Sequence, residues 1–370
     1  MSHLQLRYRV RPIKVGKIEV RLIWFDSMGA KASCILIETP DLKVLVDPGT
    51  AEMQPSYPLS TKEKWQLREK AFDAIKGAAR EADTVFISHY HYDHHTLPEE
   101  ASQIYENKRL WIKDPNRWIN HSQWERSRLF LSQLYESFEK KSFQRVLQSP
   151  KKIKIIDPLK SLPIASHKRY GDYQKRKDEL LGKGKKWLGG LVTLWGEGAW
   201  VKPFVAGKSK IRFVDGESFK IGATTIRFTK PLFHGIEYDR VGWVIGMVLE
   251  YGEAKVLYTS DIQGPMIEDY AEWIIREDPD VLVVDGPTTY LFGFMLNRIN
   301  LNRAIENVCR ILKSIDPKVI IYDHHLLRDI RYRERVAKIY RAAKDKKQNL
   351  ITAAEWLGQQ PLILKLAKNK

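Results

Sequence analysis

The sequence contains few of the features that hold secreted and membrane proteins together. Only two cysteines, Cys34 and Cys309, occur among 370 residues, and they lie far apart in apolar segments. This spacing excludes a disulfide framework and a thiolate metal site, and it indicates a reducing compartment. No apolar run approaches the ~20 residues of a membrane span, and residues 1–15 lack the apolar stretch of a signal peptide. We therefore expect a cytoplasmic protein that does not enter a membrane.

Histidine is also scarce, but it is concentrated in one place. Four of the ten histidines fall within seven positions, directly after the apolar run Thr84–Ile87, which predicts a strand. His89 and His91 are two residues apart, so in extended backbone their side chains leave on the same side. Asp93 and His94 follow as the chain turns. Imidazole with carboxylate suits Zn, Fe or Mn better than thiolate-binding metals, so we interpret this block as a metal site rather than a chance cluster in a polar loop.

The pattern His-x-His-x-Asp-His formed by this block resembles the signature of the metallo-β-lactamase superfamily. The resemblance implies that His89 and His91 hold one metal ion and that the Asp-His pair holds a second. It also implies three later ligands at strand ends: a histidine, a bridging carboxylate and a last histidine. The chain offers them in that order as His234, Asp261 and His324, with His325 as the alternative to His324. The first metal would then bind His89, His91 and His234, the second Asp93, His94 and His324, and Asp261 would bridge them. We favour His324 because it comes first after its strand.

Several further segments resemble an uncharacterised archaeal family of the same superfamily. They are Asp26–Gly29, Val46–Gly49, Ser88–His95, Ser260–Pro265, Asp285–Tyr290 and Asp323–Asp329. This likeness covers most of the chain outside a basic central segment. It implies an α/β fold, the four-layer αββα sandwich, with a two-metal site. In the superfamily an aspartate at the position of Asp47 hydrogen-bonds near the ligands, and the spacing from His324 to Arg328 resembles nuclease members. Enzymes that process the 3′ end of tRNA have a glycine soon after the histidine motif. This chain has Thr96-Leu97-Pro98 there, which argues against that activity.

The order of predicted strands and helices divides the chain into three parts. Residues 1–98 and 209–370 are rich in short apolar strands and form the two halves of the core. Residues 99–208 read as a basic, largely helical insertion. Six of the eleven tryptophans fall in the insertion, and we expect most of them to form its own small core. Gly182–Lys186 and Gly189-Gly190 predict mobile connections.

Positive charge is concentrated in this insertion. The chain carries +17, and Lys108–Lys186 alone carries +13. Such a field attracts polyanions, so we expect a nucleic acid or another polyanion as partner, with Lys175, Arg176 and Lys177 among the contacts. An ordinary solvated helical face would explain the same composition.

The ligand set predicts hydrolysis assisted by two divalent metal ions, with Zn expected first and Mn or Fe as alternatives. Two such ions activate a bridging hydroxide, so no covalent nucleophile is needed, and Asp93 and Asp261 are the candidate catalytic carboxylates. We expect a phosphodiesterase or nuclease that uses the insertion to grip its substrate. The alternatives are a hydrolase of a small anionic ester, lactone or cyclic phosphate with the insertion as a lid, and a nucleic-acid-binding protein with a relic metal site.

Overall fold

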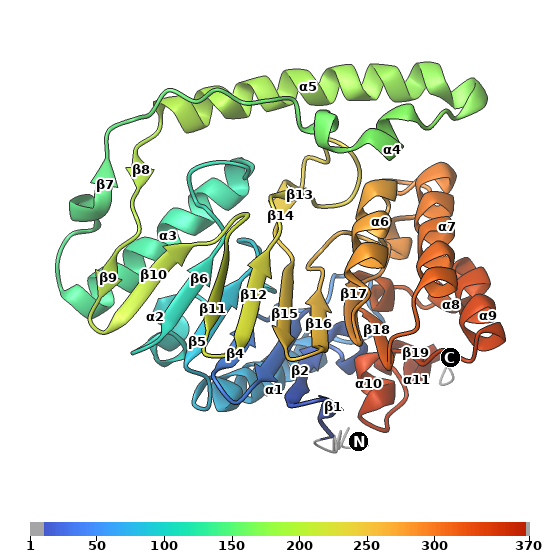
Figure 1. Cartoon of the computed structure of the whole chain (residues 1–370), viewed down its shortest axis with the longest axis horizontal. Coiled ribbons are helices and arrows are strands. Elements are labelled where there is room, and N and C mark those ends of the chain that lie inside the picture. Colours follow the sequence, from blue (N-terminus) through green and yellow to red (C-terminus); the bar gives the residue numbers. More distant parts are fainter. Residues whose placement is uncertain (1–10, 368–370) are drawn as a thin grey trace.

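The computed structural model describes residues 11–367, in which two β-sheets lie face to face with helices over both outer faces (Figure 1). Between the sheets, side chains from both form one apolar core that includes Ile37, Phe86, Ile226, Val256 and Ile321. Two further cores lie between each sheet and its helices. This order of layers confirms the predicted αββα sandwich.

The first sheet has eight strands. In spatial order they are β1 (Ile13–Val15), β2 (Ile18–Phe25), β3 (Ser33–Glu38), β4 (Lys43–Val46), β5 (Thr84–Ile87), β6 (Arg109–Ile112), β10 (Ser209–Phe213) and β9 (Val205–Ala206). β1 to β4 form an antiparallel meander, whereas β4, β5, β6 and β10 are parallel. All four residues of β5 are buried, as expected for a parallel strand that is covered on both faces.

The second sheet has seven strands and repeats this plan. In spatial order they are β11 (Ser218–Ile221), β12 (Thr224–Phe228), β15 (Met247–Tyr251), β16 (Ala254–Tyr258), β17 (Val281–Asp285), β18 (Val319–Asp323) and β19 (Leu350–Ile351). The first four are antiparallel, and β16 to β19 are parallel. Because the carboxyl ends of parallel strands meet at one edge of a sheet, the loops after β4, β5, β16, β17 and β18 are the places where functional side chains can gather.

Helices cover the outer face of each sheet. α1 (Thr61–Ala79) and α3 (His121–Glu139) pack on the first sheet, and α6 (Glu268–Glu277), α7 (Arg298–Ser314) and α9 (Ala337–Asp345) pack on the second. A capping box opens α1, with the Ser60 side chain and the Glu63 carboxylate satisfying each other's backbone N–H groups. Short helices complete the chain: α2 (Pro98–Ala101), α4 (Pro163–His167), α8 (Tyr332–Arg335), α10 (Ala353–Trp356) and α11 (Leu362–Ala367). Both cysteines are buried free thiols. In the described part of the chain, no helix combines the length and the apolar character that crossing a membrane requires.

The structure corrects the boundaries of the predicted insertion. β6 and β9 lie within residues 99–208, yet both belong to the first sheet. β6 is a central strand and its Trp111 is buried between the sheets, so the segment outside the sheets begins only after Ile112. The sequence pattern concealed β6 because it is only four residues long and lies among polar residues.

The glycines of the insertion are a second correction. Gly182, Gly184, Gly189 and Gly190, which predict mobile connections, all lie inside α5 (Gln174–Glu197). This helix runs along one edge of the molecule above the ribbon of β13 (Leu232–Phe233) and β14 (Trp243–Val244) (Figure 1). Each glycine costs a helix about 1 kcal/mol relative to alanine, and the packing of α5 on its neighbours offsets that cost.

α5 packs on the loop between β13 and β14. A Cβ atom at Gly184 would lie 2.4 Å from the Cβ of Tyr238, so only glycine permits this approach. The rings of Trp187 and Trp243 stack with their centroids 5.5 Å apart, and Trp195 is fully buried beside them. Most of the tryptophans therefore do pack in a core, as expected, but it is the core of the second sheet and not a separate one of the insertion. The small ribbon of β7 (Leu147–Gln148) and β8 (Trp200–Val201) connects the ends of the insertion.

Candidate metal centre

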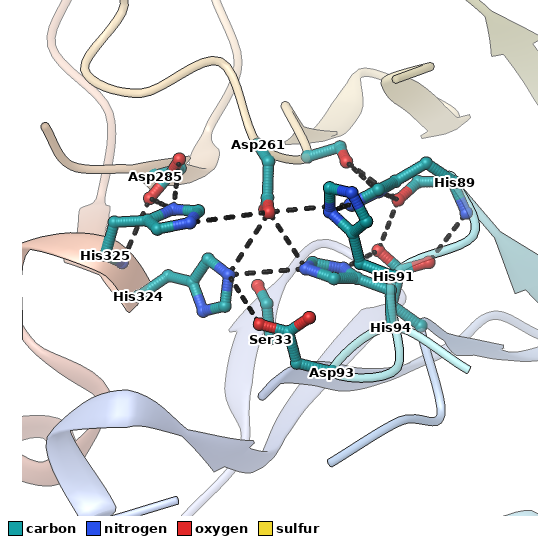
Figure 2. Close-up of polar contacts among 12 residues, drawn as sticks. Ser33, His89, His91, Asp93, His94, Asp261, Asp285, His324 and His325 are labelled. Atoms are coloured by element: carbon teal, nitrogen blue, oxygen red, sulfur yellow. Dashed lines mark hydrogen bonds and ion pairs between the residues drawn. The ribbon is translucent and has the colours of Figure 1, made fainter. Parts of the chain in front are cut away.

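The carboxylate of Asp261, just beyond β16, is the centre of the site (Figure 2). Its Oδ2 atom lies 3.0 Å from Nε2 of His94 and 3.3 Å from Nε2 of both His234 and His324. Nε2 of His89 is 3.6 Å away. One carboxylate oxygen is therefore shared by histidines from both sheets, which is the position that a bridging ligand requires.

Two groups of ligand atoms meet at this carboxylate, and within each group the atoms lie within 4.8 Å of one another. The first group contains His89, His91, His234 and Asp261, and the second contains Asp93, His94 and His324. The structure thus brings together all seven residues that the superfamily resemblance implies as ligands. They come from the ends of β5, β13, β16 and β18, which explains why residues up to 235 positions apart in sequence meet at one point.

His325 also lies beside the centre, but it is held differently from His324. Its Nε2 atom is 4.0 Å from Asp261 Oδ2, whereas its Nδ1 atom lies 3.0 Å from the carboxylate of Asp285. The ring of His325 lines a cavity, described below, that opens beside the centre. His324 is therefore the more direct ligand candidate, and His325 forms part of the cavity wall.

Asp47 connects the ligand loop to the second sheet. The backbone N–H and the hydroxyl of Ser88 donate to its carboxylate, as does the hydroxyl of Tyr258 from β16. Nδ1 of His94 lies 2.8 Å from the same carboxylate. A carboxylate that accepts the Nδ1 proton directs the opposite nitrogen of the ring toward a metal, so Asp47 orients His94 in the way that the sequence predicts.

Asp26 was not assigned a role from the sequence, yet it holds two groups of the site. Its carboxylate lies 2.9 Å from Nδ1 of His324 and accepts from Nε of Arg328 at 2.5 Å. Arg328 in turn donates to Asp93 at 3.1 Å. Asp285, which holds His325, was likewise assigned no role from the sequence. Both aspartates stand at the end of a strand and open segments that resemble the archaeal family, and these two signals in the sequence could have identified them.

Strained backbone is concentrated around the centre. Asp47, Ser260, Gln263 and His324 have positive φ angles between 46° and 66° although none is glycine. Such conformations cost of order 1–3 kcal/mol each and persist where the surrounding structure imposes them, often at functional sites. The side-chain amide of Gln263 lies 3.0 Å from Nδ1 of His234, so this strained turn also fixes a ligand candidate.

Burial and neighbouring charges set the protonation of the ligand groups. Burial, reinforced by His94, holds the pKa of His89 well below its usual value, which leaves a neutral imidazole with a free lone pair. Burial opposes ionisation of Asp261, but the charges of His324 and His94 outweigh it and hold its pKa well below the usual range. At His94, burial is in turn outweighed by Asp261 and Asp47, which raise the pKa to about 10. A bound cation would compete with that proton.

The donor atoms fit a pair of divalent cations. Oδ1 of Asp261 and Nε2 of His234 are buried, and neither has a hydrogen-bond partner among the described residues. Buried polar atoms without partners are rare and call for an unseen ligand. Imidazole and carboxylate donors suit Zn, Mn or Fe, and the structure itself favours none of the three.

A cavity of about 350 Å³ opens beside the centre. The ligand candidates His91, Asp93 and His234 line it, together with His325 and Arg328. This volume lies near the lower end of the ~300–1,000 Å³ that small-molecule sites occupy.

One of the three predicted nucleic-acid contacts is wrong. Lys177 is buried on the inner face of α5, where its ammonium donates to the carbonyl of Ala165 and lies 3.6 Å from Glu237. Lys175 and Arg176 are exposed. Successive helical residues are turned by about 100°, so three adjacent cations cannot all face one ligand.

Comparison with known proteins agrees with this fold. Residues 29–129 match the model of the metallo-beta-lactamase superfamily, whose members are largely metal-dependent hydrolases. The fold, the histidine and aspartate clusters and this match define the protein as a member of that superfamily.

Relatives of known sequence define the family more closely. A UPF0282 protein of Korarchaeum cryptofilum is 32% identical over 346 residues, which cover 93% of this chain and 91% of the relative. A UPF0282 protein of Methanopyrus kandleri is 32% identical over 357 residues, which cover 94% and 96%. The chain belongs to this UPF0282 family of archaeal proteins.

Solved structures are more distant. The unliganded yeast PDE1 structure is 12% identical with a TM-score of 0.43, and the match covers 91% of this chain and 97% of that one. The isothiocyanate hydrolase from Delia radicum gut bacteria is 13% identical with a TM-score of 0.41, and the match covers 88% and 94%.

Proposed function

We propose that the protein is a phosphodiesterase that uses two divalent metal ions to hydrolyse a small anionic substrate. The observation that carries this proposal is the position of Asp261 Oδ2, which lies within 3.6 Å of histidines from both ligand groups. A carboxylate shared in this way would hold two cations and offset their mutual repulsion. His89, His91 and His234 would hold one cation, Asp93, His94 and His324 the other, and two cations so held would lower the pKa of a bound water and stabilise both oxygens of a displacement.

The protein groups around this centre suit a phosphodiester. Arg328 lines the cavity, and its guanidinium is anchored by Asp26 and Asp93. In this position it can hydrogen-bond a non-bridging phosphoryl oxygen and stabilise negative charge on it. His325 presents Nε2 beside Asp261, and Asp285 fixes the opposite side of the ring. This pair can hold a proton next to the leaving-group oxygen.

The cavity size supports a small substrate rather than a polymer held along its length. Residues of α5 do not line the cavity, and the insertion packs on the loop that carries His234. We therefore assign α5 a supporting role. A nuclease is the second candidate, because Lys175, Lys183 and Lys186 of α5 are exposed and have no ion-pair partner in the described part of the chain.

The test is a comparison of substrate classes with protein loaded with Zn, Mn or Fe(II). At equal metal concentration the assay would compare four substrates: bis(4-nitrophenyl) phosphate, an aryl lactone, an aryl thioester and a labelled single-stranded oligonucleotide. We expect turnover of the small phosphodiester that chelation abolishes and metal restores. Turnover of the lactone or thioester alone would overturn the proposal, and turnover of the oligonucleotide alone would favour the nuclease.

A further inference from the structure

Two cations in the wall of the cavity have no carboxylate partner among residues 11–367. Lys31 and Arg126 both line the cavity beside the metal centre. Neither makes a side-chain hydrogen bond or an ion pair with any of residues 11–367. Arg328, the third cation of this wall, is by contrast bound to two carboxylates. Both side chains are partly buried and face the same cavity as the ligand candidates, so two cations without a carboxylate partner at this place indicate an anionic ligand.

The backbone holds Lys31 firmly at this place. It lies between β2 and β3, where its N–H donates to the carbonyl of Ala51 and its carbonyl accepts from the N–H of Ala51, both at 2.9 Å. The side chain is half-buried. Burial and the charge of Arg328 lower the pKa of Lys31, and the carboxylates of Asp93, Asp26 and Glu52 oppose this change. An anion bound in the cavity would favour the charged ammonium.

Arg126 reaches the same cavity from a distant part of the sequence. It lies on α3, and its guanidinium carbon is 4.6 Å from the centroid of the Tyr92 ring. Stacking on an aromatic face fixes the plane of the guanidinium and leaves its N–H groups free. Tyr92 stands between His91 and Asp93, so this cation is fixed next to the ligand loop without bonding to any ligand.

We propose that the substrate carries a second anionic group in addition to the ester that is cleaved, and that Lys31 and Arg126 bind this second group. The proposal rests on the proposed function, because it assumes that the ester itself lies at the metal centre beside Arg328. Ile236, Leu291 and Met295 give the same cavity an apolar surface, which suits the carbon body that joins the two anionic groups. The substrate class is thus a small phosphodiester with a carboxylate or phosphate at its other end.

A matched pair of substrates tests the proposal. Ethyl 4-nitrophenyl phosphate and 2-carboxyethyl 4-nitrophenyl phosphate share the ester and the leaving group, and they differ in one carboxylate. With metal-loaded wild-type protein we expect kcat/KM to favour the carboxylate substrate about tenfold, which corresponds to about 1.4 kcal/mol. The preference should arise in KM rather than in kcat.

The variants Lys31→Met and Arg126→Met should each reduce this ratio severalfold, and together they should bring it to about one. Methionine keeps the unbranched stem, and the bridge to Ala51 uses only backbone atoms, so the fold should persist. Lys31→Arg should retain most of the preference. The control Lys62→Met removes an exposed cation at the start of α1, outside the cavity, and should leave the ratio unchanged.

Failure of the proposed function can be distinguished from failure of this inference. Hydrolysis of both esters without a preference overturns the inference and leaves the phosphodiesterase proposal intact. If neither ester is cleaved, calorimetric titration of metal-loaded protein with 2-carboxyethylphosphonate and ethylphosphonate decides the matter. A preference for the carboxylate compound that Lys31→Met removes supports the inference, and equal affinity overturns it.

Discussion

The metal centre and helix α5 both carry many charged residues, but they use them in opposite ways. At the centre the charged groups are buried and bind one another, as Asp47 binds His94 and Asp26 binds Arg328. On α5 the cations Lys175 and Lys183 lie in solvent, and Lys177 of the same run is an internal contact. The identity of a buried charged residue says much about its function, because an uncompensated buried charge is costly. On a surface helix the same residue types carry little information about function.

The largest expected effect is at the centre. Asp261→Asn keeps the shape of the side chain but removes the negative charge that two cations would share. We expect metal-loaded protein to hold at most one ion per chain instead of two, measured by elemental analysis after dialysis. Phosphodiester turnover should fall by more than the roughly 10–100-fold that loss of an outer hydrogen-bond partner costs a metal site.

The exposed residue Asp73 of α1 provides the control for this change, since its side chain is 73% exposed. Asp73→Asn should leave both the metal content and the rate as they are. Two ions retained by Asp261→Asn would show that another carboxylate bridges the metals. Circular dichroism of both variants separates loss of metal from loss of fold.

The sequence predicted the centre better than its surroundings, for a physical reason. His89, His91, Asp93 and His94 lie within six positions after a strand, so their proximity follows from covalent geometry. His234, Asp261 and His324 could be located because the superfamily resemblance implies later ligands at strand ends, and each of the three follows an apolar strand. The partners of these ligands are not local. Asp26 meets His324 across 298 positions, and no periodicity in the sequence encodes that pairing.

The fold was predictable to a similar degree. Apolar runs and turn residues identified most strands of both sheets, although the short strand β6 was missed. The insertion was not predictable in the same way, because glycines in a helix read as breaks when the surface they pack against is unknown. Gly184 is the clearest case, since the reason for this glycine is Tyr238, which lies 54 positions away.

The role of α5 as a support for the metal centre leads to the second prediction. Gly184→Ala should destabilise the protein by about 1–3 kcal/mol, the usual cost of overpacking, because the new Cβ would lie 2.4 Å from Tyr238. The displaced loop carries His234, so the affinity for the first metal should fall as well. Urea denaturation and competition with a chelator measure the two effects.

Gly182 gives the matched control on the same helix. A Cβ at this position meets nothing within 4 Å, so Gly182→Ala should stabilise the protein by up to about 1 kcal/mol through helix propensity alone. Its metal affinity should equal that of the wild type. Similar destabilisation by both variants would show that the insertion tolerates no substitution, and it would remove the specific link between α5 and His234.

The smallest expected effect separates neighbouring lysines of α5. Lys177→Met removes the hydrogen bond to Ala165 and a cation beside Glu237, and should cost about 1–2 kcal/mol of stability. Lys175→Met removes an exposed cation and should change stability by less than about 0.5 kcal/mol.

The same two variants should differ in the opposite sense in salt titrations with a labelled single-stranded oligonucleotide, where Lys175→Met should have the larger effect on binding. If this face of α5 contacts phosphates, Lys175→Met should reduce the log–log slope by about 0.7, whereas Lys177→Met should leave it unchanged because its ammonium faces the protein. An unchanged slope for Lys175→Met, or no binding at low salt, would show that the positive charge of α5 serves solubility, and it would leave the metal cavity as the anion-binding site of this protein.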